Sequence, residues 1–254
     1  QYVSVVDFGA VGDGTTDDTA AIQAALDTCV PALVPPGKYR ITSSLLIDPA
    51  RNRGAGLLGT ASPSRYNTQA QTPGGVSPWD GRQESTIFYD GPSSATSCVI
   101  RASAKDIGVQ VDQTFNNTIY GLQIKNIAIN GNNKAAYGLY IIRASEPQVS
   151  NVVSTGTNSH AFYIGQAYSG EFNNIRAEIN NGCGISVGRG ELDFGWTAGK
   201  FVNAVVFTDL HASANGADKL FNETTNPAWG YGIGLWLHRG NFVNNFCSEV
   251  NDGV

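Results

Sequence analysis

The chain has 254 residues, of which 41% are hydrophobic and only 15% are charged, and its formal net charge is −5. Soluble domains usually carry about 25% charged residues, so uncharged polar groups must cover much of this surface. A net negative charge disfavours a polyanionic partner such as DNA, and no nucleic-acid binding is expected. No apolar run reaches the ~18 residues of a membrane span, so membrane insertion is not expected either.

The chain's cysteines are scattered, without the close spacing of a zinc site. They are Cys29, Cys98, Cys183 and Cys247. We expect free thiols that are buried or partly buried, with no metal and no cofactor. No secretory signal is visible, and the chain contains no Met and begins at Gln1. The natural N-terminus is therefore expected upstream, with further sequence after Val254.

Residues 5–29 predict a short amphipathic helix. Thr16 or Asp17 can cap its N-terminus. The apolar stripe at helical spacing consists of Ile22, Ala25, Leu26 and Cys29. Two short strands are expected next, around the Pro-Pro-Gly turn of ALVPPGKYRITSSLLI. Such a helix can close the open end of a stack of strands and cover its edges.

The run DFGAVGDGTTDDTAAIQAALD, followed by VPPGKYRIT, resembles the N-terminal segment of the pectate-lyase-like superfamily of right-handed β-helix proteins, most closely bacteriophage tailspike depolymerases. The resemblance covers about the first 47 residues. It implies a cap in which the aspartates are structural, namely Asp7, Asp13, Asp17 and Asp18. It also implies a parallel homotrimer in the extracellular virion tail.

A long segment without apolar periodicity follows the first strands. Residues 61–83 are rich in Pro, Gly, Ser and Gln, which indicates a loop or flap on the surface. Three regions are therefore expected. They are the cap helix and first strands over 1–60, a surface loop over 61–86, and β-helix coils over 87–254.

The later part of the chain repeats one pattern, with Asn or Asp in third position and an apolar residue in fourth. The polar anchors are Asn126, Asn151, Asn174, Asp209 and Asn245. The steps between them are 25, 23, 35 and 36 residues, and the long steps indicate insertions. A second ladder keeps the same period, in strands that begin at Gly138, Ala161, Gly184 and Gly232.

Two ladders in phase predict an all-β fold, a single-stranded parallel β-helix capped by a short α-helix, and the resemblance implies a right-handed one. The alternative is a β-sandwich with Asn-rich turns, which a fixed repeat disfavours. The anchors are expected to stack at turns, bonding side chain to backbone one coil away, while Gly supplies positive φ at the corners.

Alternation along the strands predicts which side chains leave each coil. The inward positions are Ile175, Ala177 and Ile179 in one coil, and Leu210, Ala212 and Ala214 in the next. One outward column, here called the glutamate column, reads Glu178, Ser213 and Glu249. The neighbouring one, here called the histidine column, reads Arg176, His211 and Cys247.

The glutamate column predicts an acid pair. At a strand spacing of ~4.8 Å, the backbones of Glu178 and Glu249 should lie roughly 10 Å apart. Side-chain lean can then bring the carboxyl groups to the ~6.5–9.5 Å of an inverting glycosidase. His211 lies between them and can move a proton. The plain alternative is a solvated face on which Arg176 and Glu178 are ordinary charged residues.

The two long steps bring insertions near the same column, over residues 188–203 and 216–230. Acids and aromatic rings of this kind suit a sugar cleft, although they can equally anchor their own loops. The further catalytic candidates are Glu191 and Asp193. The substrate-binding candidates are Arg176, Trp196, Trp229, Trp236, His238 and Arg239.

The resemblance implies a phage tailspike depolymerase that binds and cleaves a bacterial surface polysaccharide, capsule or O-antigen, and the outward glutamates favour cleavage by glycosidic hydrolysis. Three alternatives stay open: a lyase acting by β-elimination on a uronate polysaccharide, a non-catalytic glycan-binding receptor spike, and a secreted microbial polysaccharide enzyme. The N-T-D, D-D, G-H-G and R-I-K set of pectin-hydrolysing β-helix enzymes is absent, as is the D-P-H-E motif of alginate epimerases.

Overall fold

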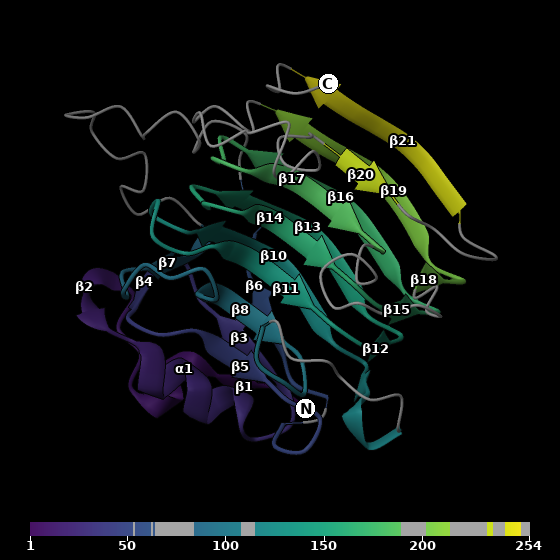
Figure 1. The fold of residues 1–254 in the computed structure, drawn as a ribbon. Helices are drawn as coiled ribbons and strands as arrows, with labels where there is room; N and C mark the ends of the chain where they lie inside the picture. Colours follow the sequence, from purple (N-terminus) through teal and green to yellow (C-terminus); the bar gives the residue numbers. More distant parts are fainter. Residues whose placement is uncertain are drawn as a thin grey trace.

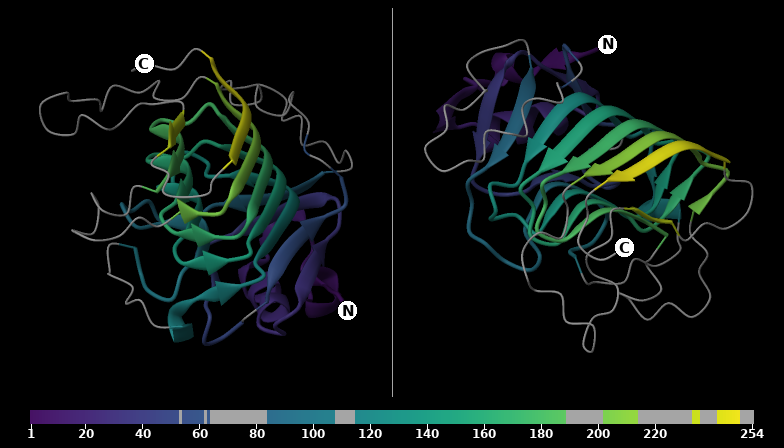
Figure 2. Two further views of the ribbon diagram at one scale, coloured as in Figure 1. Left: turned by 90° about the vertical axis from the view of Figure 1, so that its right-hand side faces the viewer. Right: turned by 90° about the horizontal axis from the view of Figure 1, so that it is seen from above.

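The computed structural model describes residues 1–52, 54–61, 63, 84–107, 115–188, 202–213, 233–235 and 242–249. In this part of the chain every strand pairing is parallel, and the coils stack on one axis (Figure 1). The N-terminal helix lies at one end of the stack and the last strand lies at the other (Figure 2). The predicted parallel β-helix is confirmed.

Three parallel sheets form the walls of the stack. The first contains β1 (Val3–Ser4), β3 (Pro31–Val34), β6 (Gly56–Gly59), β10 (Gln123–Asn130), β13 (Gln148–Thr155), β16 (Glu171–Glu178), β19 (Val206–Ser213) and β21 (Phe242–Glu249), with a branch of β2 (Asp13–Asp17), β4 (Gly37–Ile41) and β7 (Ser85–Tyr89). The second contains β5 (Leu45–Ile47), β8 (Cys98–Ala102), β11 (Tyr137–Ile141), β14 (His160–Ile164), β17 (Cys183–Val187) and β20 (Ile233–Leu235). The third contains β9 (Ile119–Tyr120), β12 (Ala144–Ser145), β15 (Ala167–Tyr168) and β18 (Val202–Asn203).

Two 3₁₀ helices and one α-helix complete the described elements: η1 (Val5–Phe8), α1 (Thr19–Leu26) and η3 (Phe115–Asn117). After the Pro-Pro-Gly turn the chain forms β4 and then β5, so the segment 31–47 makes three strands where two were predicted. β7 begins at Ser85, inside the range expected for the surface loop. No helix in the described ranges is long and apolar enough to cross a membrane.

The polar anchors sit at the fourth residue of each long strand and bend it. All of them adopt the left-handed conformation, with φ between 50° and 56°. They are Asn126, Asn151, Asn174, Asp209 and Asn245. Asn and Asp tolerate this conformation because their short polar side chains bond locally. At the corners themselves glycine supplies positive φ as expected, at Gly121, Gly156 and Gly188 with φ of 65°, 64° and 78°.

The anchors form a ladder along the stack. Asn174 Nδ2 donates to Asn151 Oδ1 at 2.8 Å, and Asn151 Nδ2 donates to Asn126 Oδ1 at 2.9 Å. Asn126 Nδ2 donates to the carbonyl of Gly59 at 3.3 Å. Farther up, Asn245 Nδ2 donates to Asp209 Oδ1. The bonds therefore run mostly from side chain to side chain, and only the lowest has the predicted side-chain-to-backbone form.

Glycine has a packing role in the second ladder. A Cβ on Gly138 would lie 2.1 Å from Ser154 Oγ and 2.5 Å from the carbonyl oxygen of Ala161. No other residue fits at this point, where two strands and the next coil approach closely. The requirement is space, since Gly138 has no positive φ.

Register survives the two long insertions, since β16 pairs with β19 across the first and β19 pairs with β21 across the second. Ile127 pairs with Val152, Val152 with Ile175, and Ile175 with Leu210, which lies 35 residues later. All four side chains are buried in one core. Phe172 and Phe207 stack beside them with ring centroids 5.2 Å apart. Truncating one of these side chains to Ala is expected to cost about 2–5 kcal/mol of stability.

The cap helix begins later than predicted. α1 starts at Thr19 with Asp18 in the N-cap position, but the Asp18 side chain makes no capping bond. Asp17 Oδ1 instead accepts the N–H of Thr19 at 3.1 Å, so Asp17 supplies the predicted bond from one position earlier, whereas Thr16 does not. Ile22, Ala25 and Leu26 are buried as expected. Cys29 is exposed and has a φ of 64°, because it lies in the turn after the helix and outside its apolar stripe.

The aspartates of the first segment hold turns together. Both Asp18 carboxylate oxygens accept backbone N–H groups, from Val11 at 2.7 Å and Gly12 at 3.1 Å. Burial raises the pKa of Asp18, in opposition to these two donors. Asp13 accepts from the backbone of Thr15 and Thr16. These contacts, together with those of Asp17 to Thr19 and Thr42, fit the structural role implied for the aspartates, while Asp7 is exposed.

Candidate functional site

Strand register places the glutamate column and the histidine column as alternation predicts. Glu178 on β16 pairs with Ser213 on β19, and Ser213 pairs with Glu249 on β21. Arg176 pairs with His211, and His211 pairs with Cys247. The two columns therefore run side by side on one face of the first sheet.

The inward positions of these strands are also largely as predicted. Ile175, Ala177, Leu210 and Ala212 are buried in the core. Ile179 is an exception, because it has a φ of 53° and is only half-buried. It lies in the turn that follows β16, where the alternation of the strand has already ended.

The outward face of β16 is covered. Arg176 is 8% exposed and Glu178 is 6% exposed, although both point away from the core. The guanidinium of Arg176 donates to the carbonyl of Pro63, which lies 113 residues earlier in the chain. The alternative of an ordinary solvated face is therefore wrong for these two residues. Charged groups in such surroundings need partners or a function, because their desolvation is costly.

Below Glu178 the glutamate column continues with polar residues, while the histidine column becomes apolar. Thr155 pairs with Glu178 and Asn130 pairs with Thr155, so hydroxyl, amide and carboxyl groups follow one another. Val153 and Ala128 occupy the same places below Arg176. His211 and Ser213 are half-buried above them. Carboxyl, imidazole and hydroxyl groups in this order can bind sugar hydroxyls and transfer protons.

Several predicted site residues lie outside the described residues. They are Glu191, Asp193, Trp196, Trp229, Trp236, His238 and Arg239. For Glu249 and Cys247 the structure gives the strand register alone. Their site roles stay predictions. In the described ranges, no three His, Cys, Asp or Glu side chains gather in a way that could hold a metal ion.

An aromatic group on the second sheet was not predicted from the sequence. Tyr137 stacks on His160 with ring centroids 5.5 Å apart, and Tyr140 stacks on Tyr163 at 5.0 Å. Edge-to-face contacts join the two pairs, between Tyr137 and Tyr140 at 5.2 Å and between His160 and Tyr163 at 5.4 Å. The repeat in the sequence could have predicted this group, because YGLY and HAFY begin 23 residues apart, one coil period, and carry aromatic rings at the same two positions.

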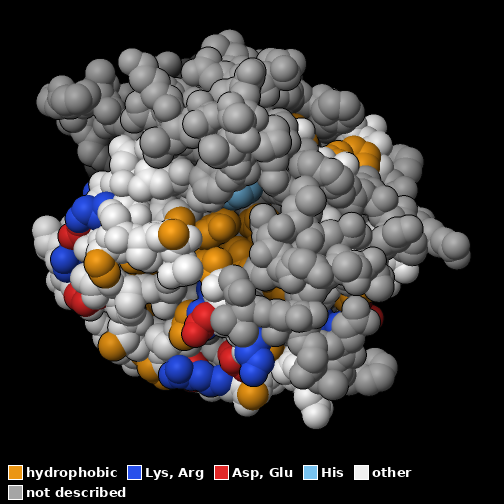
Figure 3. All heavy atoms as spheres, in the orientation of Figure 1, with side chains coloured by type: hydrophobic (Ala, Val, Ile, Leu, Met, Phe, Trp, Pro, Cys, Tyr) orange, Lys and Arg blue, Asp and Glu red, His pale blue; other side chains and the backbone are white. Residues whose placement is uncertain are grey.

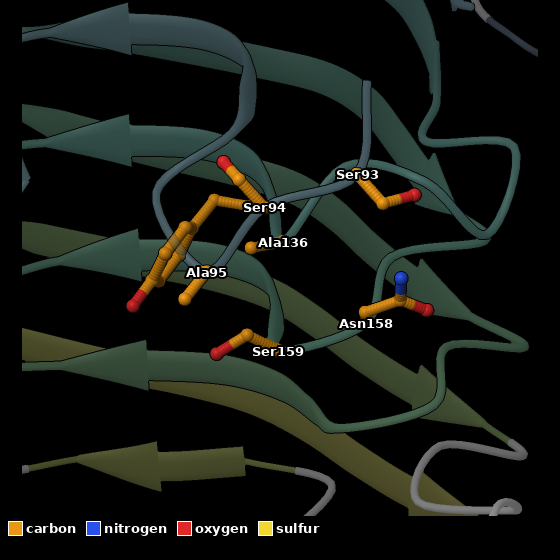
Figure 4. Close-up of a pocket in the computed structure, with 7 residues that line it drawn as sticks. Ser93, Ser94, Ala95, Ala136, Asn158 and Ser159 are labelled. Carbon is orange, nitrogen blue, oxygen red and sulfur yellow. The ribbon is translucent and has the colours of Figure 1, made fainter. Parts of the chain in front are cut away.

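A cavity of about 460 Å³ adjoins the aromatic group at a corner of the coils. One wall comes from the loop between β7 and β8, and the other comes from the turns that precede β11 and β14 (Figure 4). Its lining residues are Ser93, Ser94, Ala95, Ala136, Tyr137, Asn158 and Ser159. In the space-filling view, hydrophobic side chains gather in a hollow on one face of the molecule, and a histidine lies at the edge of this hollow (Figure 3).

Of the described cysteines, Cys29 is exposed, against the expectation that the thiols are at least partly buried. Cys98 and Cys183 are buried free thiols, as expected. Burial raises the pKa of the Cys98 thiol far above its ordinary value, so it stays protonated at neutral pH.

Solved structures share this fold at low sequence identity. The ORF18 protein of Geobacillus virus E2 superposes with a TM-score of 0.63 and 18% identity, over 97% of this chain and 41% of that one. The A-module of mannuronan C-5 epimerase AlgE6 from Azotobacter vinelandii gives 0.63 and 16%, over 97% and 56%. The Dettilon tailspike protein gp208 gives 0.52 and 14%, over 94% and 38%.

Curated relatives match over a short segment. Mannuronan C5-epimerase AlgE5 of Azotobacter vinelandii is 52% identical over 44 residues, which are 15% of this chain and 4% of that protein. AlgE6 of the same organism is 48% identical over 46 residues, 16% of this chain and 5% of that protein. The matched segment thus spans only a small part of these relatives.

The family model for rhamnogalacturonase A/epimerase, pectate lyase-like, matches residues 2–206. This match covers most of the chain and includes the cap, the asparagine ladder up to Asn174 and the strand that carries Arg176 and Glu178. The chain therefore belongs to the rhamnogalacturonase A/epimerase, pectate lyase-like family.

Proposed function

We propose that this chain is the β-helix of a phage tailspike that binds a bacterial surface polysaccharide, capsule or O-antigen, and cleaves it by hydrolysis. The family and the likeness to a tailspike protein and a phage ORF18 protein support a polysaccharide-acting phage protein. A homotrimer in the extracellular virion tail belongs to the same proposal. A rigid stack with uncharged polar side chains outside is well suited to long, hydroxyl-rich polymers.

The observation that carries the proposal is the register of the glutamate column. Glu178 and Glu249 are separated by one coil, that of Ser213, which puts their backbones roughly 10 Å apart. In the proposed mechanism the two carboxyl groups act at the separation typical of inverting glycosidases, ~6.5–9.5 Å. One carboxyl group then protonates the leaving oxygen, while the other activates the attacking water.

The histidine column supplies the supporting groups. His211 pairs with Arg176 and Cys247, so its backbone lies between the levels of the two glutamates. In the proposed mechanism it holds or moves a proton beside the acid pair. Arg176 binds substrate hydroxyl or carboxylate groups from the adjoining level, for which a planar guanidinium is suited. Glu191 and Asp193 are further acid candidates, and Trp196, Trp229, Trp236, His238 and Arg239 are proposed to line the cleft.

Cleavage by β-elimination is the second candidate. Arg176 next to His211 places a cation beside a base, which is the pair that elimination at a uronate needs. The base abstracts the C5 proton, the cation neutralises the carboxylate, and the bond to the leaving oxygen breaks as a double bond forms. The curated relatives are by name C5-epimerases of mannuronan, so their reaction is also at C5 of a sugar.

One incubation separates these functions. Purified protein is mixed with a panel of bacterial capsules and O-antigens, with alginate as a uronate polymer, and polymer size is followed by size-exclusion chromatography. Hydrolysis predicts shorter chains with new reducing ends and no new ultraviolet absorbance. Elimination predicts absorbance from an unsaturated product. Binding without a decrease in polymer size would indicate a receptor spike. A result with no binding and no decrease in polymer size would overturn the proposal. Light scattering on the same sample tests the homotrimer.

A further inference from the structure

The cavity beside the aromatic group has the properties of a binding site of its own. Its volume of about 460 Å³ falls within the ~300–1,000 Å³ of small-ligand sites. It lies at the corner that follows β10 and β13, below the level of Glu178, and none of its lining residues belongs to the glutamate or histidine column. The two places are therefore separable by mutation.

The lining combines an aromatic ring, methyl groups and uncharged polar groups. Tyr137, Ala95 and Ala136 supply apolar surface. Ser93, Ser94, Asn158 and Ser159 supply hydroxyl and amide groups, and no lining residue in the described chain carries a charge. A sugar ring needs this combination, because its C–H face packs on apolar surface while its hydroxyls need hydrogen-bond partners. A charged ligand would find no counter-ion among these residues.

Two of the lining residues are fixed before any ligand arrives. The Tyr137 ring makes ring contacts with His160, Tyr140 and Tyr163. Asn158 belongs to a second ladder, in which its Nδ2 donates to the carbonyl of Asn133 at 2.9 Å. Its Oδ1 accepts from Asn181 Nδ2 at 2.8 Å. A binding surface that is already ordered loses little entropy when it binds.

Asn158 also retains hydrogen-bonding capacity. A side-chain amide has two N–H donors and two acceptor lone pairs, and the ladder uses one of each. One donor and one acceptor are left for a ligand. Ser159 is oriented from behind, because its Oγ lies 2.8 Å from His160 Nδ1. Asn158 and Ser159 thus present directed polar groups across from Ser93 and Ser94 (Figure 4).

We propose that this cavity binds one uncharged pyranose residue, as a sugar-binding subsite distinct from the glutamate column. The ring packs against Tyr137 and the Ala95 and Ala136 methyl groups, and Asn158 and the serines bond its hydroxyls. The choice of a sugar rests in part on the proposed function, whereas the site requires binding alone and no cleavage. A polymer held here would be tethered one to two coils below the acid pair.

Titration with simple sugars tests the subsite directly. The probes are methyl glucopyranoside, methyl galactopyranoside, methyl mannopyranoside and N-acetylglucosamine, with glucuronate as the charged comparison, followed by saturation-transfer NMR. At least one uncharged probe is expected to bind at millimolar concentration and more tightly than glucuronate. Ala95→Trp fills the cavity from an exposed loop, and binding should weaken about tenfold or more. Ser93→Trp gives a second, independent block from the same loop.

The matched control is Thr96→Trp, because Thr96 is exposed on the same loop and does not line the cavity. It should bind the probes as the parent protein does. Glu178→Gln should also keep probe binding, because the titration measures binding alone, so the subsite and the proposed cleavage can fail separately. Absence of binding by every uncharged probe, or equal binding by Ala95→Trp, Ser93→Trp and parent, would overturn the subsite.

Discussion

Glu178 and Glu249 pair in register with the same residue, Ser213, from its two sides. The stack, and not a loop, therefore fixes the distance between the two backbones. Three long strands hold the three levels of the column, and core residues buried at alternate positions of β16 and β19 fix the register of these two strands. A proposed acid pair on such a scaffold is preorganised, which is where enzymes gain most from rigid elements.

Filling the middle level of the glutamate column should abolish access to the acid pair. In Ser213→Trp the indole would occupy the space between the two glutamates, so kcat/KM on the polysaccharide should fall by about a hundredfold or more. Ser213 is half-buried and lies at the end of its strand, so the melting temperature should change little. Thr208→Trp, on the same strand outside both columns, is the control. Equal activity of the two variants would exclude a substrate path over Ser213.

The asparagine ladder should contribute measurable stability. Asn151→Ala removes one bond to Asn126 and one from Asn174, and it forces Ala into a φ of 54°. The expected loss is about 2–4 kcal/mol in the free energy of urea unfolding. Asn151→Gly loses the same bonds without the backbone strain, so it should lose less.

Asn173 gives the control for this measurement, because it is the exposed neighbour of the ladder and has no positive φ. Asn173→Ala should change the free energy of unfolding by less than about 0.5 kcal/mol. If Asn151→Ala were as stable as Asn173→Ala, the side-chain hydrogen bonds of the ladder would contribute nothing measurable to stability.

One ion-pair cluster predicts a pH dependence of stability. Lys134 and Arg40 hold the pKa of Asp90 below its ordinary value through hydrogen bonds of 2.6 and 2.8 Å. A lowered pKa means that the folded state binds the proton less well than the unfolded state. The stabilisation is therefore complete above the unfolded pKa of about 3.9 and is lost as pH falls through the lower folded pKa.

The size of this effect should be small, because Asp90 and its partners are partly exposed. Asp90→Asn should cost below about 1 kcal/mol at pH 7 and nothing at a pH below the folded pKa, as read from urea unfolding curves. If Asp90→Asn lowered the free energy of unfolding equally at both pH values, Asp90 would contribute through packing and not through its charge.

The stacked coils could be predicted from the sequence, because the repeat shows which residues of successive coils lie in register. Asn126, Asn151 and Asn174 recur at steps of 25 and 23 residues, and the same residues form the ladder. The conformation of these anchors was not predicted, since Asn and Gly both tolerate a positive φ and the pattern cannot tell which of them supplies it. The helix start was missed because the carboxylate of Asp18 bonds Val11 and Gly12 instead of the helix.

The surroundings of the site were harder to predict, because they depend on contacts between distant residues. Alternation places Arg176 outside the coil, but it says nothing of Pro63, whose carbonyl accepts from that guanidinium. The cavity likewise needs the loop of Ser93 to meet the turn of Asn158. Loop paths of this kind leave no periodic signal in a sequence.

The central claim is that the two glutamates of the column cleave a polysaccharide, and loss of polymer size after single substitutions tests it most directly. Glu178→Gln and Glu249→Gln should each slow chain shortening by about a hundredfold or more while binding persists. Glu171→Gln is the matched control, because Glu171 is exposed at the other end of the same strand as Glu178. Chain shortening at the parental rate by Glu178→Gln or Glu249→Gln would contradict the account.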